Sequence, residues 1–141
     1  MKSVETTMVI RREPRAVWDV LSDFDAYEEW NPILTVRRGT PRAGSAVEVA
    51  VDRPGHTTRT ETAKLTAVDP GVRLQWEAVA LYSWLYRSTQ TFELRRLEGG
   101  RTRLVNRTAC GGILAPLVVS EGFETENKRL NRALADRVEN R

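Results

Sequence analysis

The last third of the chain contains a long amphipathic helical pattern, which limits what the chain can fold into. The pattern opens with the small and apolar residues 111–117 and runs nearly to the C-terminus. Its apolar stripe contains Phe123, Leu130, Leu134 and Val138, with Asn127 set inside it. One amphipathic helix cannot bury its stripe alone, so the rest of the chain has to supply a partner surface.

Strand-like segments before the helix supply that surface. Apolar–polar alternation bounded by turn signals predicts strands at residues 2–12, 33–38, 45–52, 58–68, 72–79, 86–97 and 101–110. Two short helices are predicted after the first strand, one near Pro14 and one at residues 23–30. The predicted order is β-α-α-β6-α, an α+β arrangement in which a curved antiparallel sheet grips the last helix. A hollow between sheet and helix would suit a small apolar molecule.

Length and composition fit one globular domain over residues 1–141, with 40% hydrophobic and 29% charged residues. No apolar run approaches the ~20 residues that span a bilayer, and the N-terminus has no apolar signal core. We therefore expect a cytoplasmic protein without stable membrane insertion. The net charge is +3. Basic and acidic residues alternate rather than cluster, so we expect no binding to nucleic acid.

Few residues fit known catalytic or metal-binding patterns. His56 is the only histidine and lies in a Pro-Gly turn, so a site with two histidines is excluded and no metal is expected. The single Cys110 excludes an internal disulfide and is interpreted as a small buried thiol. The sequence has neither a glycine-rich phosphate loop nor a nucleophile elbow, and no cofactor is expected.

Three stretches of the sequence carry a family resemblance. They are residues 16–32 (AVWDVLSDFDAYEEWNP), residues 74–76 (LQW) with 92–94 (FEL) and 99–104 (GGRTRL), and residues 122–130 (GFETENKRL). In these the chain resembles the SRPBCC or Bet v 1/START-like helix-grip superfamily, most closely its small bacterial polyketide cyclase/dehydrase-like branch. The resemblance implies a seven-stranded antiparallel sheet wrapped around the C-terminal helix, with the two short helices closing one end. It also implies a cavity, which members use to bind lipids or hormones, to cyclise polyketides, to dehydrate, or to act as cofactor-binding chaperones.

Strand alternation predicts which side chains face this cavity. We expect Phe92 and Leu104 to face inward, so every second residue of the last two strands should face inward with them. Leu65 determines the inward face of an earlier strand in the same way. The predicted ligand-binding residues are Trp30, Trp76, Trp84, Ser88, Gln90, Asn106, Thr108, Phe123 and Asn127. The predicted catalytic residues are Arg59, Glu61 and Tyr86.

Each of these assignments has a structural alternative. Arg59 and Glu61 could form an ion pair at the mouth of the sheet, because charged residues are rarely fully buried. Asn106 and Asn127 could make structural hydrogen bonds instead of ligand contacts. The tryptophans could simply fill packing positions.

Three functions stay open on the sequence alone. A cyclase/dehydrase-like enzyme would work mainly by shape, with Arg59 polarising a carbonyl and Glu61 or Tyr86 moving a proton. A carrier would bind a lipid or hydrophobic metabolite without catalysis, and an interaction module would bind a protein. A hydrophobic small molecule is the expected partner, and the expected state is a monomer or homodimer. Convergence of Arg59, Glu61 and a tyrosine hydroxyl on one point of the cavity would favour catalysis.

Overall fold

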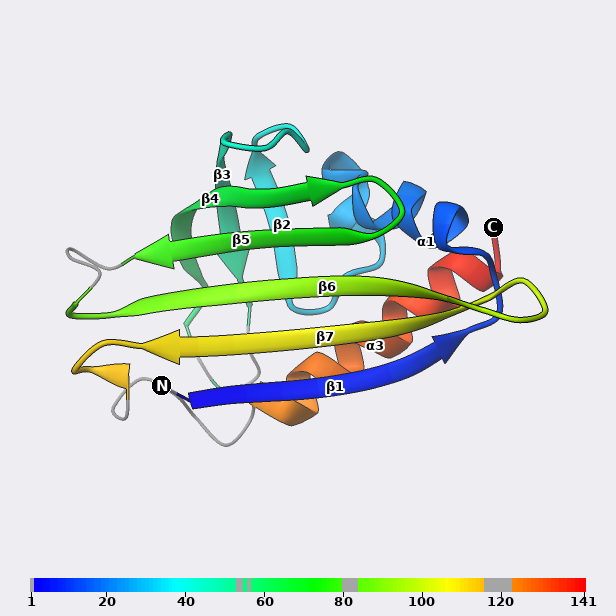
Figure 1. Cartoon of the computed structure of the whole chain (residues 1–141). Helices are drawn as coiled ribbons and strands as arrows, with labels where there is room; N and C mark the ends of the chain where they lie inside the picture. Colours follow the sequence, from blue (N-terminus) through cyan, green and yellow to red (C-terminus); the bar gives the residue numbers. More distant parts are fainter. Residues whose placement is uncertain (1, 53–54, 56, 80–83, 116–122) are drawn as a thin grey trace.

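The computed structural model describes the chain except residues 1, 53–54, 56, 80–83 and 116–122 (Figure 1). His56 and the predicted connection at residues 80–83 lie outside the described residues. The elements are β1 (Lys2–Ile10), α1 (Pro14–Leu21), η1 (Phe24–Glu29), β2 (Leu34–Arg38), β3 (Ala46–Val51), β4 (Arg59–Asp69), β5 (Arg73–Val79), β6 (Arg87–Leu97), β7 (Arg101–Gly111) and α3 (Phe123–Glu139).

The strands form one seven-stranded antiparallel sheet in the order β1-β7-β6-β5-β4-β3-β2. The first strand pairs with the last, in a register that runs from Lys2 opposite Cys110 to Ile10 opposite Thr102. Figure 1 shows β2 and β3 running across the direction of β6 and β7, with α3 behind β7 and β1. The sheet therefore curves around α3, and the helix-grip architecture predicted from the sequence is confirmed.

The hydrophobic core lies between the concave face of the sheet and the apolar stripe of α3. Leu130, Leu134 and Val138 of the helix are all buried, in the same cluster as Phe92 and Leu104 of the sheet. The prediction that Phe92 of β6 and Leu104 of β7 face the helix is thus correct. No helix within the described residues is long and apolar enough to cross a membrane.

The C-terminal helix does not open at residue 111. Gly111 is the last residue of β7, where it lies opposite Arg87, and residues 112–114 form a turn. Gly112 has a φ of 97°, and a Cβ atom there would lie 2.6 Å from the carbonyl oxygen of Leu85. Only glycine fits this turn. Pairing with β6 therefore overrides the helical appearance of the apolar run, because tertiary contacts outweigh local propensity.

The second short helix is the 3₁₀ helix η1, packed around a buried tyrosine. The Tyr27 hydroxyl donates to the carbonyl oxygen of Leu21 at the end of α1. After η1, the Asn31 side-chain oxygen accepts hydrogen bonds from the backbone N–H groups of Ile33 (3.0 Å) and Leu34 (2.8 Å). This Asn turn leads the chain from η1 into β2.

Candidate functional site

A cavity of about 80 Å³ lies between the concave face of the sheet and the first half of α3. It is lined by Ile33, Leu34, Val51, Arg59, Glu61, Trp76, Tyr86, Ser88, Thr89, Gln90, Thr108, Cys110, Phe123, Glu126, Asn127 and Leu130. A more open hollow of about 400 Å³ shares Arg59, Glu61, Tyr86 and Ser88 with it and continues to Val79 and Leu114. These four shared residues border both the cavity and the hollow, and we call them the neck.

Aromatic and aliphatic side chains form the inner wall of the cavity. Trp76 of β5 is buried and packs against Phe92, with ring centroids 5.7 Å apart and an interplanar angle of 57°. Phe123 and Leu130, which are seven positions apart on α3, close the opposite side. The wall that a ligand would meet first inside the neck is therefore largely apolar.

Two charged residues of β4 stand at the neck. Arg59 and Glu61 are two positions apart on one strand and so share a face. The Arg59 Nη2 and Glu61 Oε2 atoms are 3.8 Å apart, and the two side chains are 56% and 32% exposed. The ion pair expected from the structural alternative is present, and both of its members also line the cavity and the hollow.

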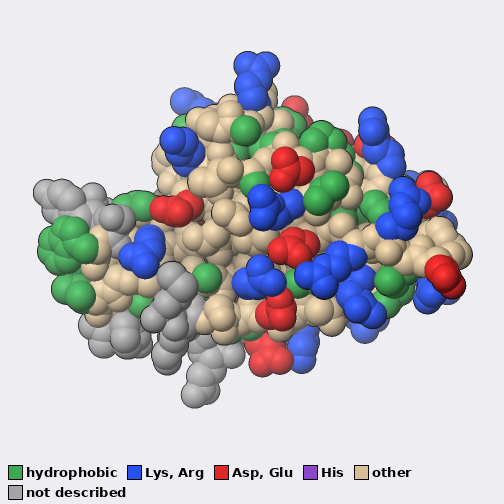
Figure 2. Space-filling view, viewed as in Figure 1, with side chains coloured by type: hydrophobic (Ala, Val, Ile, Leu, Met, Phe, Trp, Pro, Cys, Tyr) green, Lys and Arg blue, Asp and Glu red, His purple; other side chains and the backbone are tan. Residues whose placement is uncertain are grey.

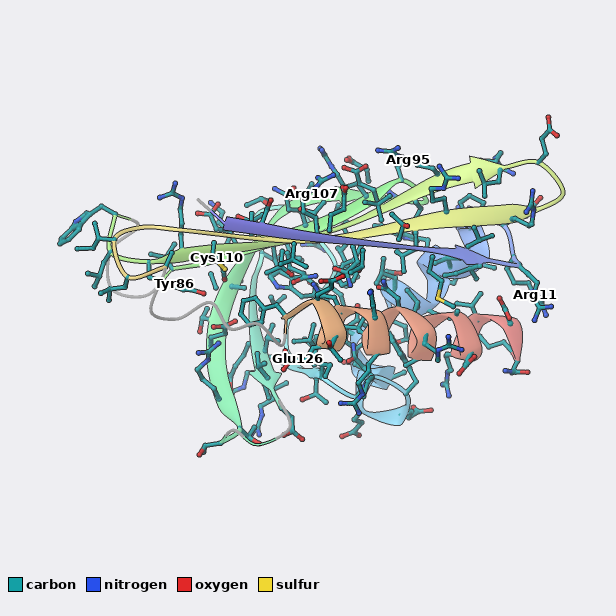
Figure 3. All side chains as sticks on the ribbon, turned by 90° about the horizontal axis from the view of Figure 1, so that it is seen from below. Arg11, Tyr86, Arg95, Arg107, Cys110 and Glu126 are labelled. Atoms are coloured by element: carbon teal, nitrogen blue, oxygen red, sulfur yellow. The ribbon has the colours of Figure 1, made fainter. Side chains whose placement is uncertain are left out.

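A tyrosine and a cysteine lie beside this charged pair. The Tyr86 hydroxyl and Cys110 Sγ are 3.5 Å apart, and Cys110 is buried. Burial, followed by the interaction with Cys110, raises the pKa of Tyr86 above its ordinary value of 10.0, while the Arg59 charge acts in the opposite direction. The phenol is therefore protonated at neutral pH. Figure 3 shows Tyr86 and Cys110 on the α3 side of the sheet and Arg95 and Arg107 on the other side.

A chain of hydrogen-bonded amides and hydroxyls runs from the cavity into the core. Asn127 Nδ2 donates to Thr108 Oγ1 at 2.9 Å, and Thr108 Oγ1 donates to Gln90 Oε1 at 2.8 Å. Gln90 Nε2 then donates to Asn106 Oδ1. Because Gln90 makes both of these bonds, its side chain is fixed where it borders the cavity.

The inner half of this polar chain is fully buried. Asn106 Nδ2 donates to Asn131 Oδ1 at 2.9 Å, and Asn131 Nδ2 donates to Thr6 Oγ1 at 2.9 Å. Thr6 in turn donates to the backbone oxygen of Asn106 at 3.4 Å. These bonds satisfy polar groups that would otherwise be costly to bury.

The structure brings most of the predicted site residues to the cavity. The residues that line it are Arg59, Glu61, Tyr86, Trp76, Ser88, Gln90, Thr108, Phe123 and Asn127. Three predicted residues do not line it. Asn106 is buried behind Gln90, Trp30 packs edge-on against Tyr27 with centroids 5.1 Å apart, and Trp84 is 60% exposed beyond the start of β6. Asn106 and Trp30 thus make structural contacts, and Trp84 lies at the surface.

Two polar residues of α3 near the site were not predicted. Glu126 lines the cavity from α3, and Asn131 anchors the buried end of the polar chain. A signal for both exists in the sequence. Glu126 is three positions after Phe123, and Asn131 is four positions after Asn127, spacings that put each pair on one helix face.

A curved antiparallel sheet that grips a C-terminal helix around a cavity defines a Bet v 1-like helix-grip protein. Solved structures agree with this class. A protein from Chromobacterium violaceum has a TM-score of 0.79 at 17% identity, over 97% of this chain and 96% of that one. An aromatase/cyclase from Streptomyces sp. R1128 has a TM-score of 0.69 at 18% identity, over 98% and 93%. A point mutant of norcoclaurine synthase from Thalictrum flavum, in complex with a transition-state analogue, has a TM-score of 0.73 at 13% identity, over 99% and 94%.

The sequence itself identifies the family. The model of the family described as polyketide cyclase / dehydrase and lipid transport matches residues 1–139, so the chain belongs to that family. The resemblance inferred from the sequence is confirmed. No curated protein matches the sequence closely.

Proposed function

We propose that the protein binds a hydrophobic small molecule that carries a carbonyl group, with its bulk in the hollow and a small apolar group directed toward Trp76 and Phe123 in the cavity. The observation that carries this proposal is the shared neck, where an apolar space meets a few polar side chains. At that point Tyr86 is a neutral donor and Arg59 a cationic donor, and both suit a carbonyl oxygen. Membership of a polyketide cyclase / dehydrase and lipid transport family supports the same ligand class.

The sizes of the two spaces limit how such a ligand could lie. Pockets for small molecules usually measure about 300–1,000 Å³, and an apolar cavity of about 150 Å³ takes up benzene. The cavity of about 80 Å³ is too small for a ring unless side chains move, whereas the hollow of about 400 Å³ is large enough. The bulk of the ligand therefore occupies the hollow, and a small group reaches through the neck.

Binding can be measured with a fluorescent aromatic ketone, 6-propionyl-2-dimethylaminonaphthalene. We expect a blue-shifted emission on binding and an affinity about fivefold lower for Tyr86→Phe, which loses one neutral hydrogen bond of about 1 kcal/mol. Arg59→Met should weaken binding at least as much. A wild-type protein that leaves the probe's emission unchanged would refute the proposal.

The chain offers a matched control for Arg59. The Arg95 side chain is 60% exposed, close to the 56% of Arg59. Like Arg59, it forms an ion pair with a glutamate two positions away on its strand, in this case Glu93 at 3.1 Å. It lies on the face of the sheet opposite α3 (Figure 3). Arg95→Met should therefore leave the affinity for the ketone unchanged. Equal losses for the two arginine variants would point to a general effect of charge rather than to a site at the neck.

The finer proposal is a cyclase/dehydrase-like reaction. Glu61 removes a proton from the carbon next to a bound carbonyl, and Tyr86 and Arg59 stabilise the enolate oxygen. The enolate carbon then bonds to a second carbonyl carbon of the same molecule, and the oxygen of that carbonyl takes the proton back from Glu61. Loss of water from that alcohol gives the unsaturated ring. All three side chains line both the cavity and the hollow, which supports this proposal.

The alternative is a carrier that binds without reacting. The two differ in whether bound ketones lose their α-protons, so we would measure deuterium exchange into 2-acetylnaphthalene in D₂O by mass spectrometry. A catalytic site should accelerate exchange about 10²-fold or more over buffer, and Glu61→Gln should remove the acceleration while leaving affinity intact. Exchange at the buffer rate in the wild-type protein, with the ketone bound, would support the carrier and exclude the catalytic proposal.

A further inference from the structure

Exposed hydrophobic side chains gather at one end of the molecule. Within the described residues, Ile113 is 68% exposed, Trp84 60% and Val79 45%. We call these three residues the apolar tip. The other large exposed hydrophobic residues, Val72 and Val9, belong to the opposite end, near the β4–β5 turn and the end of β1. Figure 2 shows a hydrophobic cluster at the left end, where β6 begins and β7 ends.

The backbone holds the apolar tip in a fixed form. The Ile113 N–H donates to the Trp84 carbonyl oxygen at 3.0 Å, and the Leu114 N–H donates to the Leu85 carbonyl oxygen at 3.0 Å. These bonds extend the β6–β7 pairing beyond Gly111 and set Trp84 and Ile113 side by side. The close approach at Gly112 described above locks the same turn. The folded backbone therefore holds Trp84 and Ile113 at the surface.

The tip adjoins the entrance to the ligand space. Val79 belongs to the tip and also lines the hollow, together with Leu114, the residue after Ile113. A surface that covered the tip would therefore lie next to the opening of the hollow. A hydrophobic ligand could pass between that surface and the neck with little exposure to water.

The chemistry of the tip fits a lipid surface. Tryptophan combines a large apolar body with one polar N–H and concentrates at membrane–water interfaces. Arg87 lies at the base of the tip, opposite both Val79 and Gly111 in the sheet register. The chain carries a net charge of +3. Exposed apolar side chains on a protein of net positive charge are complementary to a bilayer that contains anionic lipid.

We propose that the apolar tip seats the protein reversibly on an anionic bilayer, with the opening of the hollow facing the lipid. This inference goes beyond ligand binding, because it assigns a second surface whose partner is the bilayer itself. It is independent of whether the site is catalytic.

The test is co-sedimentation of the full chain with sucrose-loaded vesicles, without added ligand. Vesicles of phosphatidylcholine mixed with phosphatidylglycerol should bind the wild-type protein, and vesicles of phosphatidylcholine alone should bind it less. The double variant Trp84→Ser/Ile113→Ser should reduce partitioning about tenfold or more, because two apolar side chains no longer enter the interface. Val72→Ser is the matched control: it removes a side chain that is 57% exposed at the other end and should bind like the wild type.

Tryptophan emission gives a second readout. Trp18 and Trp76 are buried, whereas Trp84 is exposed, so anionic vesicles should shift mainly the Trp84 emission to the blue. The shift should vanish in Trp84→Phe. An unchanged wild-type emission, equal partitioning of the double variant, or equal binding to neutral vesicles would overturn the proposal. So would a change from dimer to monomer in the double variant without vesicle binding, which would make the tip an interface between copies of the chain.

The two proposals fail separately. In vesicle-free buffer the double variant should bind the aromatic ketone as the wild type does, because neither substituted residue lines the cavity or the hollow. If the wild type binds vesicles but not the ketone, the ligand proposal falls and the membrane surface stands. If the wild type binds the ketone but not vesicles, the membrane proposal falls and the ligand proposal stands.

Discussion

Replacing Asn131 by leucine tests whether the buried polar chain stabilises the fold. The substitution keeps roughly the same shape but removes the oxygen that accepts from Asn106 Nδ2 at 2.9 Å and the amide that donates to Thr6 Oγ1 at 2.9 Å. Asn106 is 0% exposed, so water cannot replace the lost acceptor. Thr6 keeps its own bond to the Asn106 backbone oxygen and loses less.

The expected cost follows from the group left without a partner. An unsatisfied buried donor costs about 1–3 kcal/mol, and the added apolar surface of leucine offsets part of this. We expect a loss of about 1–2 kcal/mol in the free energy of unfolding. For a chain of 141 residues this lowers Tm by roughly 3–8 °C.

The assay is thermal and urea unfolding followed by far-UV circular dichroism. Asn140→Leu is the control: this residue is exposed just after α3, where its side chain donates to the Asp136 backbone oxygen at 2.8 Å. It should change stability by less than about 0.5 kcal/mol. In the double variant Asn106→Leu/Asn131→Leu both partners become apolar, and the loss should be smaller than the sum of the single losses by about 0.5–3 kcal/mol. Wild-type stability in Asn131→Leu, or strict additivity in the double variant, would refute the reasoning.

Two further predictions concern the backbone turn and the acid stability. Gly112→Ala should cost about 2–4 kcal/mol, because alanine meets both a positive φ and the Leu85 carbonyl oxygen, whereas Gly71→Ala, with a φ of 76° and open space, should cost only about 1–2 kcal/mol. Equal urea midpoints for the two variants would exclude the close contact. Hydrogen bonds from the Arg11 backbone N–H and side chain hold the pKa of Glu139 below its ordinary value of 4.5, so this interaction stabilises the fold above that pH and is lost as pH falls through the lowered pKa. The difference in Tm between wild type and Glu139→Gln should therefore be present at neutral pH and disappear in acid; a constant difference would contradict this.

Strand alternation predicted the fold and most of the cavity wall because one face of each strand is buried. Phe92 and Leu104 fixed the phase of β6 and β7, and with it the inward position of Gln90 and Thr108. The same logic holds in β4 up to Leu65. Beyond it a bulge shifts the register between Leu65 and Ala67, so Leu65 pairs with Trp76 but Ala67 pairs with Gln75.

Two of the three predicted residues that do not line the cavity, Trp84 and Trp30, lie where periodicity does not apply. Trp84 precedes β6 in a connection, and Trp30 follows a 3₁₀ helix, so no strand or helix phase determines where either ring points. The site also depends on partners across the sheet. That Asn131 would meet Asn106 follows from the packing of α3 on the sheet, which the order of residues along the chain does not reveal.

The pairing of β1 with β7 has a consequence for how the protein is made. Lys2 lies opposite Cys110, so β1 finds its neighbour in the sheet only after β7, at residues 101–111, has been translated. At about 5–20 residues per second this leaves β1 waiting for roughly 5–20 s. Contacts so distant along the chain also slow folding in general. During that interval β1 is an unpaired strand, and we expect a chaperone that shields it to raise the yield of native protein.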